Sequence, residues 1–300
     1  MSTLTKILRG TGVAIVTPFN HKHEVDFSAL EKLIEYLIQG GVEYIVALGT
    51  TGETPVLSKE EKKEILLFVY EKVNKRVPVV VGIGGNHTAE VIDDLNNLPL
   101  QHATAILSTA PYYNKPSQEG LYQHYKTIAE SAPLPILLYN VPGRTGRNME
   151  ASTTIRLATE VANIAGIKEA SGDMVQCMEL LRQCPDDFMI VSGDDNLALP
   201  QIACGMTGVI SVAANAFPAS FSNMIRLCLS RNFSAAKQIN DTLIPAYHLM
   251  FAENNPAGVK AFMSEIKIIE NEVRLPIVQL SKNYYDQVKN LIFDLPNDFR

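Results

Sequence analysis

Apolar residues follow two patterns that alternate along the chain. Short continuous runs are typical of strands buried in a parallel sheet, whereas apolar residues spaced three or four apart indicate helices with one buried face. Glycine, proline and polar clusters separate the two kinds of segment. The runs predict eight strands, at residues 12–18, 44–49, 77–84, 103–109, 135–140, 164–170, 188–193 and 208–213.

A helix is expected after each of these strands. Ser58 and Glu61 have the spacing of a capping box, in which each side chain binds the other residue's backbone N–H. Asp26 and Asp173 precede helical patterns in the manner of N-caps. The expected helices begin near residues 26, 58, 88, 117, 153, 173, 197 and 218.

Eight successive strand–helix units point to a parallel sheet with helical crossovers. Eight is the number that closes a (β/α)8 TIM barrel, and the even spacing favours this α/β fold over an open doubly wound sheet. No strand pattern follows residue 231, and polar breaks such as AENNPAG at 252–258 separate the remaining helices. We therefore expect a barrel domain at 1–231 and a C-terminal helical domain at 232–300.

The composition is ordinary for a soluble globular protein, with 46% hydrophobic and 19% charged residues. The net charge is −6 and the basic residues are dispersed, so nucleic acid is not an expected partner. We also expect no membrane association, because no apolar run approaches the roughly 20 residues of a membrane helix and MSTLTKILRGTG does not resemble a secretion signal. The four cysteines include no CxxC pair, which fits a reducing cytoplasm; they are Cys177, Cys184, Cys204 and Cys228.

Polar residues follow several of the predicted strands. In a barrel these strand ends meet at one rim, where the active site lies. The residues are Thr50 and Thr51 after the second strand, Tyr112 and Tyr113 after the fourth, Tyr139 and Arg144 at the fifth, Lys168 at the sixth, and Gly193 with Asp194 at the seventh.

Lys168 has two interpretations. A strand-end lysine can simply leave the sheet for water, or it can be a nucleophile, because removal from water favours the unprotonated amine that attacks a ketone. Gly166, two residues earlier on the same face, leaves room for a substrate. Tyr139 favours the second interpretation, because a phenol can move the protons that carbinolamine chemistry requires. Packing is the alternative role for Tyr112 and Tyr113.

Arg144 lies in the Gly-flanked loop PGRTG. A guanidinium binds a carboxylate through two parallel hydrogen bonds, although a surface ion pair is the alternative. Backbone N–H groups around Thr50 and Thr51 are candidates for a second carboxylate.

Two other motifs point to different chemistry. HKHE at 21–24 has the HxH spacing of a metal-dependent amidohydrolase, but it lies beyond the first strand, and strands five and six supply no histidine. GIGGN at 82–86 lacks the spacing of a nucleotide-binding loop. We interpret the first as a surface loop and the second as a strand-end turn, and we expect neither a metal nor an organic cofactor.

Four stretches, in this order and spacing, resemble the dihydrodipicolinate synthase family. They are GTTGE at 49–53, YYNKPSQEGLYQHY at 112–125, LLYNVPGRTG at 137–146 and GIKEASGD at 166–173. The family belongs to the N-acetylneuraminate lyase group of pyruvate-dependent barrels, and the resemblance covers nearly the whole chain. It implies a cofactor-free lyase that condenses pyruvate with L-aspartate 4-semialdehyde to give 4-hydroxy-tetrahydrodipicolinate, on the route to diaminopimelate and lysine.

The resemblance also implies which residues react. Lys168 matches the lysine that forms a Schiff base with pyruvate. Tyr139, Thr50 and Tyr113 match the family's proton relay, in which Tyr113 comes from a neighbouring subunit. Family members are commonly homotetramers built from tight dimers.

Binding roles follow from the same match. Thr51 matches the residue that holds the pyruvate carboxylate, and Arg144 matches the arginine that receives the carboxylate of aspartate semialdehyde. Gly193 and Ile210 match residues that line the site, mainly through their backbone carbonyls.

Regulation by lysine is doubtful. Asn86, Glu90 and Tyr112 match positions that contact the inhibitor, but Lys59 and Lys62 stand where many lysine-inhibited members carry histidine or an aromatic residue. Two ammonium groups repel a cationic effector, so we expect weak or absent inhibition. A charged helix face is the plainer explanation of both lysines.

Related reactions remain as alternatives. An N-acetylneuraminate lyase or a keto-deoxy sugar acid aldolase would use Lys168 and Tyr139 in the same way. Arg144 favours aspartate semialdehyde, because sugar-acid enzymes of the group generally lack an arginine there. A non-catalytic protein on this scaffold would be expected to lose Lys168 or the relay.

Overall fold

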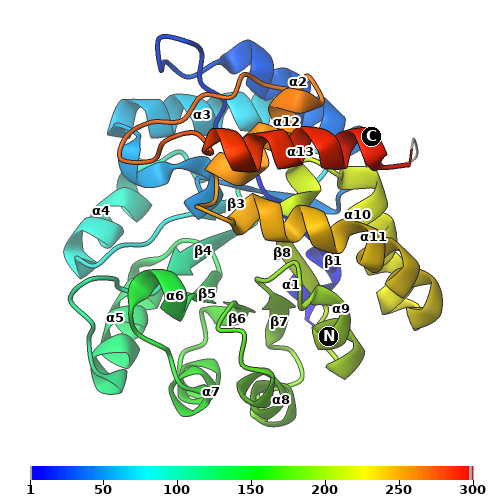
Figure 1. Cartoon of the computed structure of the whole chain (residues 1–300). Helices are drawn as coiled ribbons and strands as arrows, with labels where there is room; N and C mark the ends of the chain where they lie inside the picture. The colour runs from blue at the N-terminus through cyan, green and yellow to red at the C-terminus, as the bar shows by residue number, and fades with distance from the viewer. Residues whose placement is uncertain (1, 297–298, 300) are drawn as a thin grey trace.

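Eight parallel strands close into a barrel in the order β1 to β8 (Figure 1). The structure is a computed structural model that describes residues 2–296 and 299. The (β/α)8 barrel expected from the sequence is therefore confirmed. The strands are β1 Gly10–Ala14, β2 Tyr44–Ala47, β3 Val79–Gly82, β4 Ala105–Thr109, β5 Ile136–Asn140, β6 Ile164–Glu169, β7 Met189–Ser192 and β8 Gly208–Ser211.

Helices surround the barrel, one following each strand (Figure 1). They are α2 Phe27–Gln39, α3 Lys59–Val73, α4 Thr88–Asn97, α5 Gln118–Ser131, α7 Ala151–Glu160, α8 Met174–Gln183, α9 Ala198–Cys204 and α10 Pro218–Leu229. Shorter elements are α1 Thr3–Ile7 before β1, the 3-10 helices η1 Thr50–Gly52 and η2 Thr54–Val56 after β2, α6 Pro142–Thr145 after β5, and η3 Ala213–Asn215 after β8.

The predicted helix caps are present. Ser58 and Glu61 form the complete capping box at the start of α3. The Asp26 carboxylate accepts the backbone N–H of Ala29, and Asp173 caps α8 in the same way. Because a cap satisfies backbone donors that have no partner inside the helix, these side chains set where the helices begin.

The first strand differs from its prediction. It begins at Gly10 rather than at residue 12, and it ends at Ala14 rather than at residue 18. Gly10 has no side chain and so adds nothing to an apolar pattern. It nevertheless pairs with Gly208 of β8, and a side chain at position 208 would overlap the Gly10 backbone. After Ala14 the ladder ends, because the N–H of Val16 donates to the side chain of Asn215 instead.

The barrel interior is filled by its own side chains. Tyr44 of β2 is fully buried there and occupies the space that a side chain at Gly12 would need. Leu8, after α1, joins the same inner cluster from the amino-terminal end. The interior is therefore a packed core rather than a channel, and in this fold the active site lies beyond the carboxyl ends of the strands.

Three further helices complete the chain. They are α11 Phe233–Phe251, α12 Ala257–Glu265 and α13 Lys282–Asp294. In Figure 1, α12 and α13 lie across the upper part of the molecule, and α11 runs below α13 from the centre to the right. The break between α11 and α12 falls in the AENNPAG segment, as expected. The division into two domains at residue 231 stays a prediction. No helix in the described ranges is long and apolar enough to cross a membrane.

Candidate active site

Lys168 and Tyr139 lie side by side at the carboxyl ends of β6 and β5. The register of the two strands pairs them directly, so both side chains point into the barrel mouth. The Lys168 Nζ atom lies 4.1 Å from the centre of the Tyr139 ring. Lys168 is only 5% exposed and Tyr139 6%. The first interpretation of Lys168, a side chain leaving the sheet for water, is therefore wrong.

Gly193 provides the space that Lys168 occupies. A Cβ atom at Gly193 would lie 2.9 Å from the Lys168 Cε atom and 2.6 Å from the Cβ atom of Ala170. Real Cβ atoms essentially never lie this close to other carbons, because the atoms would overlap and the close-packed interior has no empty space into which the neighbours could move. Glycine at this position therefore allows the lysine side chain to extend along the end of β7.

The opposite face of the same two strands carries a buried polar network. Side chains alternate along a strand, so Asn140 and Glu169 point away from the barrel interior. The Asn140 Nδ2 atom donates to both carboxylate oxygens of Glu169, at 3.2 and 3.0 Å. Gln176 Nε2 and the Ser171 backbone N–H also donate to this carboxylate. The network ties together the strand ends that present Tyr139 and Lys168, and no pattern in the sequence indicated it.

The GTTGE segment forms a tight turn beyond β2. Within η1, the Gly52 N–H donates to the Gly49 carbonyl, and the Thr17 hydroxyl donates to the Gly52 carbonyl at 2.7 Å. Thr51 is buried beneath the turn, whereas Thr50 is partly exposed. The two hydroxyls that the sequence singled out therefore face different surroundings, and Thr50 is the one that borders the cavity described below.

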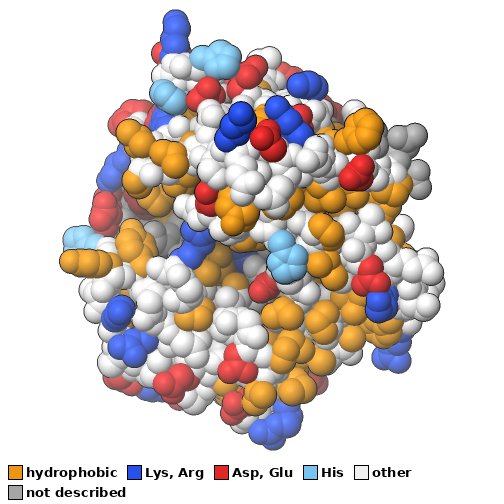
Figure 2. Space-filling view, viewed as in Figure 1, with side chains coloured by type: hydrophobic (Ala, Val, Ile, Leu, Met, Phe, Trp, Pro, Cys, Tyr) orange, Lys and Arg blue, Asp and Glu red, His pale blue; other side chains and the backbone are white. Residues whose placement is uncertain are grey.

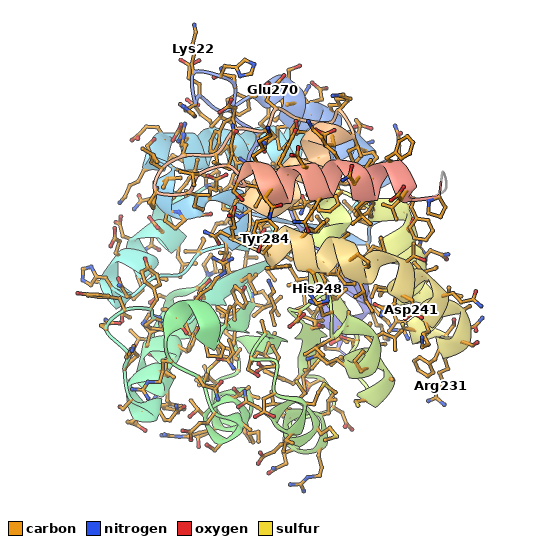
Figure 3. All side chains as sticks on the ribbon, in the orientation of Figure 1. Lys22, Arg231, Asp241, His248, Glu270 and Tyr284 are labelled. Atoms are coloured by element: carbon orange, nitrogen blue, oxygen red, sulfur yellow. The ribbon has the colours of Figure 1, made fainter. Side chains whose placement is uncertain are left out.

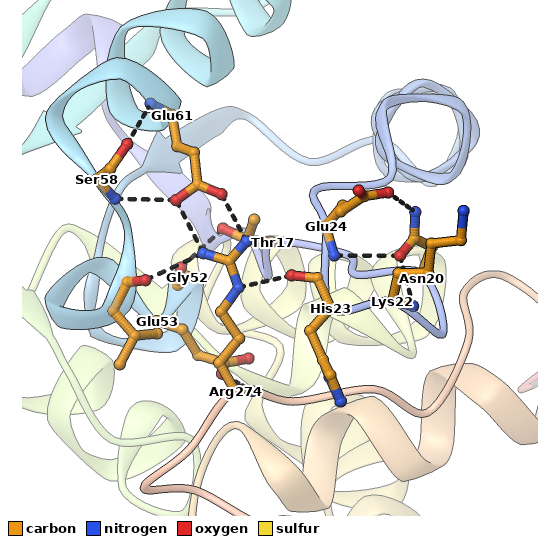
Figure 4. A network of polar contacts seen from close by, with 11 residues as sticks. Thr17, Asn20, Lys22, His23, Glu24, Gly52, Glu53, Ser58, Glu61 and Arg274 are labelled. Carbon is orange, nitrogen blue, oxygen red and sulfur yellow. Dashed lines mark hydrogen bonds and ion pairs between the residues drawn. The ribbon is translucent and has the colours of Figure 1, made fainter.

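Glu53 anchors this turn to the C-terminal helices. Its carboxylate forms an ion pair of 2.6 Å with Lys260 of α12, and both side chains have no solvent exposure. It also accepts the backbone N–H of Arg274 at 3.0 Å, and the Arg274 guanidinium binds the Glu61 carboxylate and the His23 carbonyl (Figure 4). Burial lowers the pKa of Lys260, while the charge of Glu53 opposes that change.

A cavity of about 430 Å³ opens above these residues. Thr50, Tyr139 and Arg144 line it together. Figure 2 shows the face of the molecule hollowed near its centre, between α6 and α11. Arg144 lies on α6, and its Nη2 atom donates to the Asn255 carbonyl at 3.0 Å. The cavity thus joins a phenol, a hydroxyl and a guanidinium, which suits a small ligand that carries a carboxylate.

The structure does not bring every predicted residue to the wall of the cavity: Lys168, Thr51 and Gly193 do not line it. Ile210 is fully buried in the inner cluster with Tyr139. Tyr113 is 88% exposed, has a left-handed backbone with φ of 70°, and does not line this cavity in its own chain. Its neighbour Tyr112 does line the cavity, although it is 42% exposed. An exposed pair of aromatic residues at the rim of a site is unusual for a surface that stays in water.

The remaining motifs lie elsewhere. His21 and His23 of the HKHE segment are exposed and pair with Glu272, and His21 also approaches Glu270. Figure 3 shows Lys22 and Glu270 at the outer edge of the molecule, away from the barrel mouth. Among the described residues, no three His, Cys, Asp or Glu side chains are arranged to hold a metal ion. The HKHE segment is a surface loop, as the preferred interpretation held.

The two lysines of the doubtful effector site differ in their contacts. Lys59 binds Asp93 at 3.1 Å on the surface. Lys62 lines the outer part of the cavity together with Asn86, Glu90 and Tyr112. The cavity therefore continues from the strand ends toward α3 and α4.

The fold and the site together define a (β/α)8-barrel enzyme whose active site lies at the carboxyl ends of the strands. A lysine and a tyrosine are buried side by side there, beneath a cavity with an arginine at its rim. The chain belongs to the dihydrodipicolinate synthetase family, whose family model matches residues 7–294. The resemblance found in the sequence is thereby confirmed.

Individual relatives agree over nearly the full length. The 4-hydroxy-tetrahydrodipicolinate synthase of Parabacteroides distasonis is 46% identical over 288 residues, which cover 96% of this chain and 97% of the relative. The enzyme of the same name from Cytophaga hutchinsonii is 51% identical over 272 residues, 91% of each chain. The crystal structure of dihydrodipicolinate synthase from Thermotoga maritima superposes with a TM-score of 0.93 at 37% identity, and covers 96% of this chain and 98% of that one.

Proposed function

We propose that this chain catalyses the 4-hydroxy-tetrahydrodipicolinate synthase reaction, the condensation of pyruvate with L-aspartate 4-semialdehyde. The observation that carries the proposal is the buried Lys168 amine beside the Tyr139 ring, since Tyr139 itself lines a cavity together with Thr50 and Arg144. The names of the relatives support the same reaction.

The first half of the reaction activates pyruvate. The unprotonated amine of Lys168 attacks the ketone carbon, and the former carbonyl oxygen takes up a proton and later leaves as water. Tyr139 lies beside the amine and delivers these protons, and Thr50 with Tyr113 of a neighbouring subunit completes the relay. The resulting protonated imine withdraws electrons, so a methyl proton of the bound pyruvate leaves and an enamine forms.

The second half joins the two substrates. The enamine carbon attacks the aldehyde carbon, and the aldehyde oxygen becomes a hydroxyl group. The amino group of the semialdehyde then attacks the imine carbon and displaces the Lys168 amine, so the ring closes and keeps the C=N bond. One water is released overall, and no oxidant or reductant is consumed.

Two residues hold the carboxylates. Thr51 holds that of pyruvate. Arg144 receives that of the semialdehyde from the rim, where a planar guanidinium suits a carboxylate. The family resemblance assigns Gly193 and Ile210 to the wall of the same site, through their backbone carbonyls.

Borohydride trapping tests the proposal directly. Reduction in the presence of pyruvate should fix one pyruvyl group on Lys168, identified by mass spectrometry of peptides, and Lys168→Ala should lose it. Tyr139→Phe should fold normally and lose most turnover with aspartate semialdehyde. Adduct formation at another lysine, or normal rates in Tyr139→Phe, would refute the assignment. Turnover of N-acetylneuraminate instead of aspartate semialdehyde would favour the sugar-acid alternative.

We propose that the active form is an oligomer, a homotetramer built from tight dimers, in which Tyr113 enters the neighbour's site. The exposure of Tyr112 and Tyr113 supports this assembly. Subunit mixing tests it: Lys168→Ala and Tyr113→Phe proteins should each be impaired. In a mixed dimer, the Tyr113→Phe chain supplies Lys168 and the Lys168→Ala chain supplies Tyr113 to the same site. That site contains both native residues, so the mixture should regain activity. If Tyr113 acts within its own chain, the mixture gains nothing.

Weak or absent inhibition by lysine also belongs to the proposal. Lys62 brings an ammonium group into the part of the cavity that Glu90 and Asn86 line, so a second cation is repelled there. Substantial inhibition by submillimolar lysine would contradict this. A cytoplasmic location, consistent with four free cysteines, is testable by cell fractionation.

A further inference from the structure

Asn255 connects the two residues to which the proposed function assigns the substrate carboxylates. It lies between α11 and α12 and is only 4% exposed. Its side-chain Nδ2 atom donates to the Thr51 hydroxyl oxygen at 3.0 Å. Its backbone carbonyl accepts from Arg144 Nη2, also at 3.0 Å. A single residue of the C-terminal segment therefore touches both carboxylate receptors, which come from different barrel loops.

The direction of the first hydrogen bond has a chemical consequence. A hydroxyl group carries one proton and can both donate and accept. Because the Thr51 oxygen accepts from the Asn255 amide, its own proton stays available for a ligand. An acceptor at position 255 would take that proton, and Thr51 could no longer offer it to a carboxylate.

The position of Asn255 is well fixed. Lys260 of the following helix forms the buried ion pair with Glu53, two residues after Thr51. Arg274 binds the same carboxylate through its backbone N–H. The segment that carries Asn255, with the helix α12 that follows it, is thus joined to the turn that carries Thr51 at two points, and Arg274 beyond α12 adds a third contact to the same turn.

We infer that Asn255 is a positioning residue for pyruvate, which keeps the Thr51 hydroxyl oriented as a donor toward the keto-acid carboxylate. The inference rests on the proposed function, since it takes the ligand of Thr51 from there. The side chain of Asn255 acts on the pyruvate end alone, because Arg144 is held by the backbone carbonyl, which every substitution at position 255 retains.

The test is Asn255→Asp, which is nearly isosteric with the native side chain. At neutral pH the introduced carboxylate accepts the Thr51 proton and repels the pyruvate carboxylate. The pyruvate concentration that gives half-maximal borohydride trapping should rise about tenfold or more. The KM for aspartate semialdehyde should stay within about twofold, since such a change is under half a kcal/mol of binding free energy. Asn255→Ala lacks the donor but adds no charge. In this variant the pyruvate concentration that gives half-maximal trapping should rise about fivefold.

Acidic pH gives a further readout. A protonated carboxyl group has an O–H that donates to Thr51 as the amide does, so pyruvate trapping by Asn255→Asp should improve as the pH falls. The charged groups near this segment are Arg144 of α6, which contacts it, and the Glu53–Lys260 pair on the elements packed beside it. These groups are shared with the wild type, whose own pH profile is therefore the reference.

Asn254→Asp is the matched control. It makes the same chemical change one residue earlier, where the side chain is exposed, and it should leave pyruvate trapping unchanged. Circular dichroism shows whether each variant folds. The inference is overturned if folded Asn255→Asp needs the same pyruvate concentration for half-maximal trapping as the wild type. It is also overturned if that concentration and the KM for aspartate semialdehyde rise by the same factor. In either case, wild-type trapping on Lys168 still upholds the proposed function. Absence of the wild-type adduct would refute both.

Discussion

The buried ion pair between Glu53 and Lys260 makes a sharp prediction about stability. Neither side chain has any solvent exposure, so replacement of Lys260 by methionine leaves a carboxylate without its cation in the protein interior. Removal of one partner from a buried pair costs about 3–5 kcal/mol. Glu53 keeps the backbone N–H of Arg274 as a donor, which places the expected loss of unfolding free energy for Lys260→Met near the lower end, about 3 kcal/mol.

The double variant separates charge from packing. Burial lowers the pKa of Lys260, which means that the fold disfavours its ammonium even beside a carboxylate. Replacement of both groups by neutral side chains, Glu53→Gln with Lys260→Met, is therefore expected to restore most of the loss, to within about 1 kcal/mol of the wild type. The pair then contributes orientation of the Thr50–Thr51 turn more than net stability.

Urea unfolding at one fixed protein concentration is the assay. The chain contains no tryptophan, so far-UV circular dichroism is the natural probe. Lys22→Met is the control, because Lys22 is exposed on the 20–24 loop, and it should change stability by less than about 0.5 kcal/mol. The reasoning is refuted if Lys260→Met costs under about 1 kcal/mol, or if the effects of the two substitutions simply add.

Three further predictions concern buried groups. Burial lowers the pKa of His124 to about 4. As the pH drops from about 6.5 to 4, the imidazole is protonated in the unfolded chain but not in the folded one, so the unfolding free energy falls by up to about 3 kcal/mol. Urea titrations of His124→Gln should lack this loss. Burial raises the pKa of Asp195 to about 6, so here the folded state holds the proton and stability falls by up to about 3 kcal/mol as the pH rises from about 4 to 6. Asp195→Asn should remove that dependence, and an unchanged curve would show that the carboxyl group finds solvation in the fold. Gly193→Ala should place a methyl group against Lys168 and lower kcat/KM at least about tenfold, with an unchanged circular dichroism spectrum; near-normal turnover would contradict the close packing of the lysine.

Sequence patterns predicted most of the architecture, because strand and helix periodicity and the caps at Asp26, Ser58 and Asp173 are local signals. The start of β1 was misplaced, since Gly10 is required by its φ of 110° and by the Glu43 side chain packed against it rather than by hydrophobicity. The four-residue helix α6 was not foreseen, because its Pro-Gly start has the composition of a turn.

The site was partly accessible from sequence. Lys168 and Tyr139 stand at the ends of predicted strands, so the barrel topology brings them together. Glu169 and Asn255 were missed, because their partners lie in other elements and only the tertiary fold supplies them. One signal was available: Lys260 interrupts the otherwise apolar run AGVKAFM, and a lysine in such a run needs a buried partner.

The separation of the two carboxylate receptors has a consequence for redesign. Arg144 sits on the short helix α6, and its guanidinium donates to the Asn255 backbone carbonyl, whereas Lys168 is held by strand pairing and by its packing against Gly193. An engineer who wants a different aldehyde can therefore vary Arg144 itself. The residues after α6 have to stay, because the Met149 N–H donates to Asn140 and so belongs to the network that joins the strand ends of Tyr139 and Lys168.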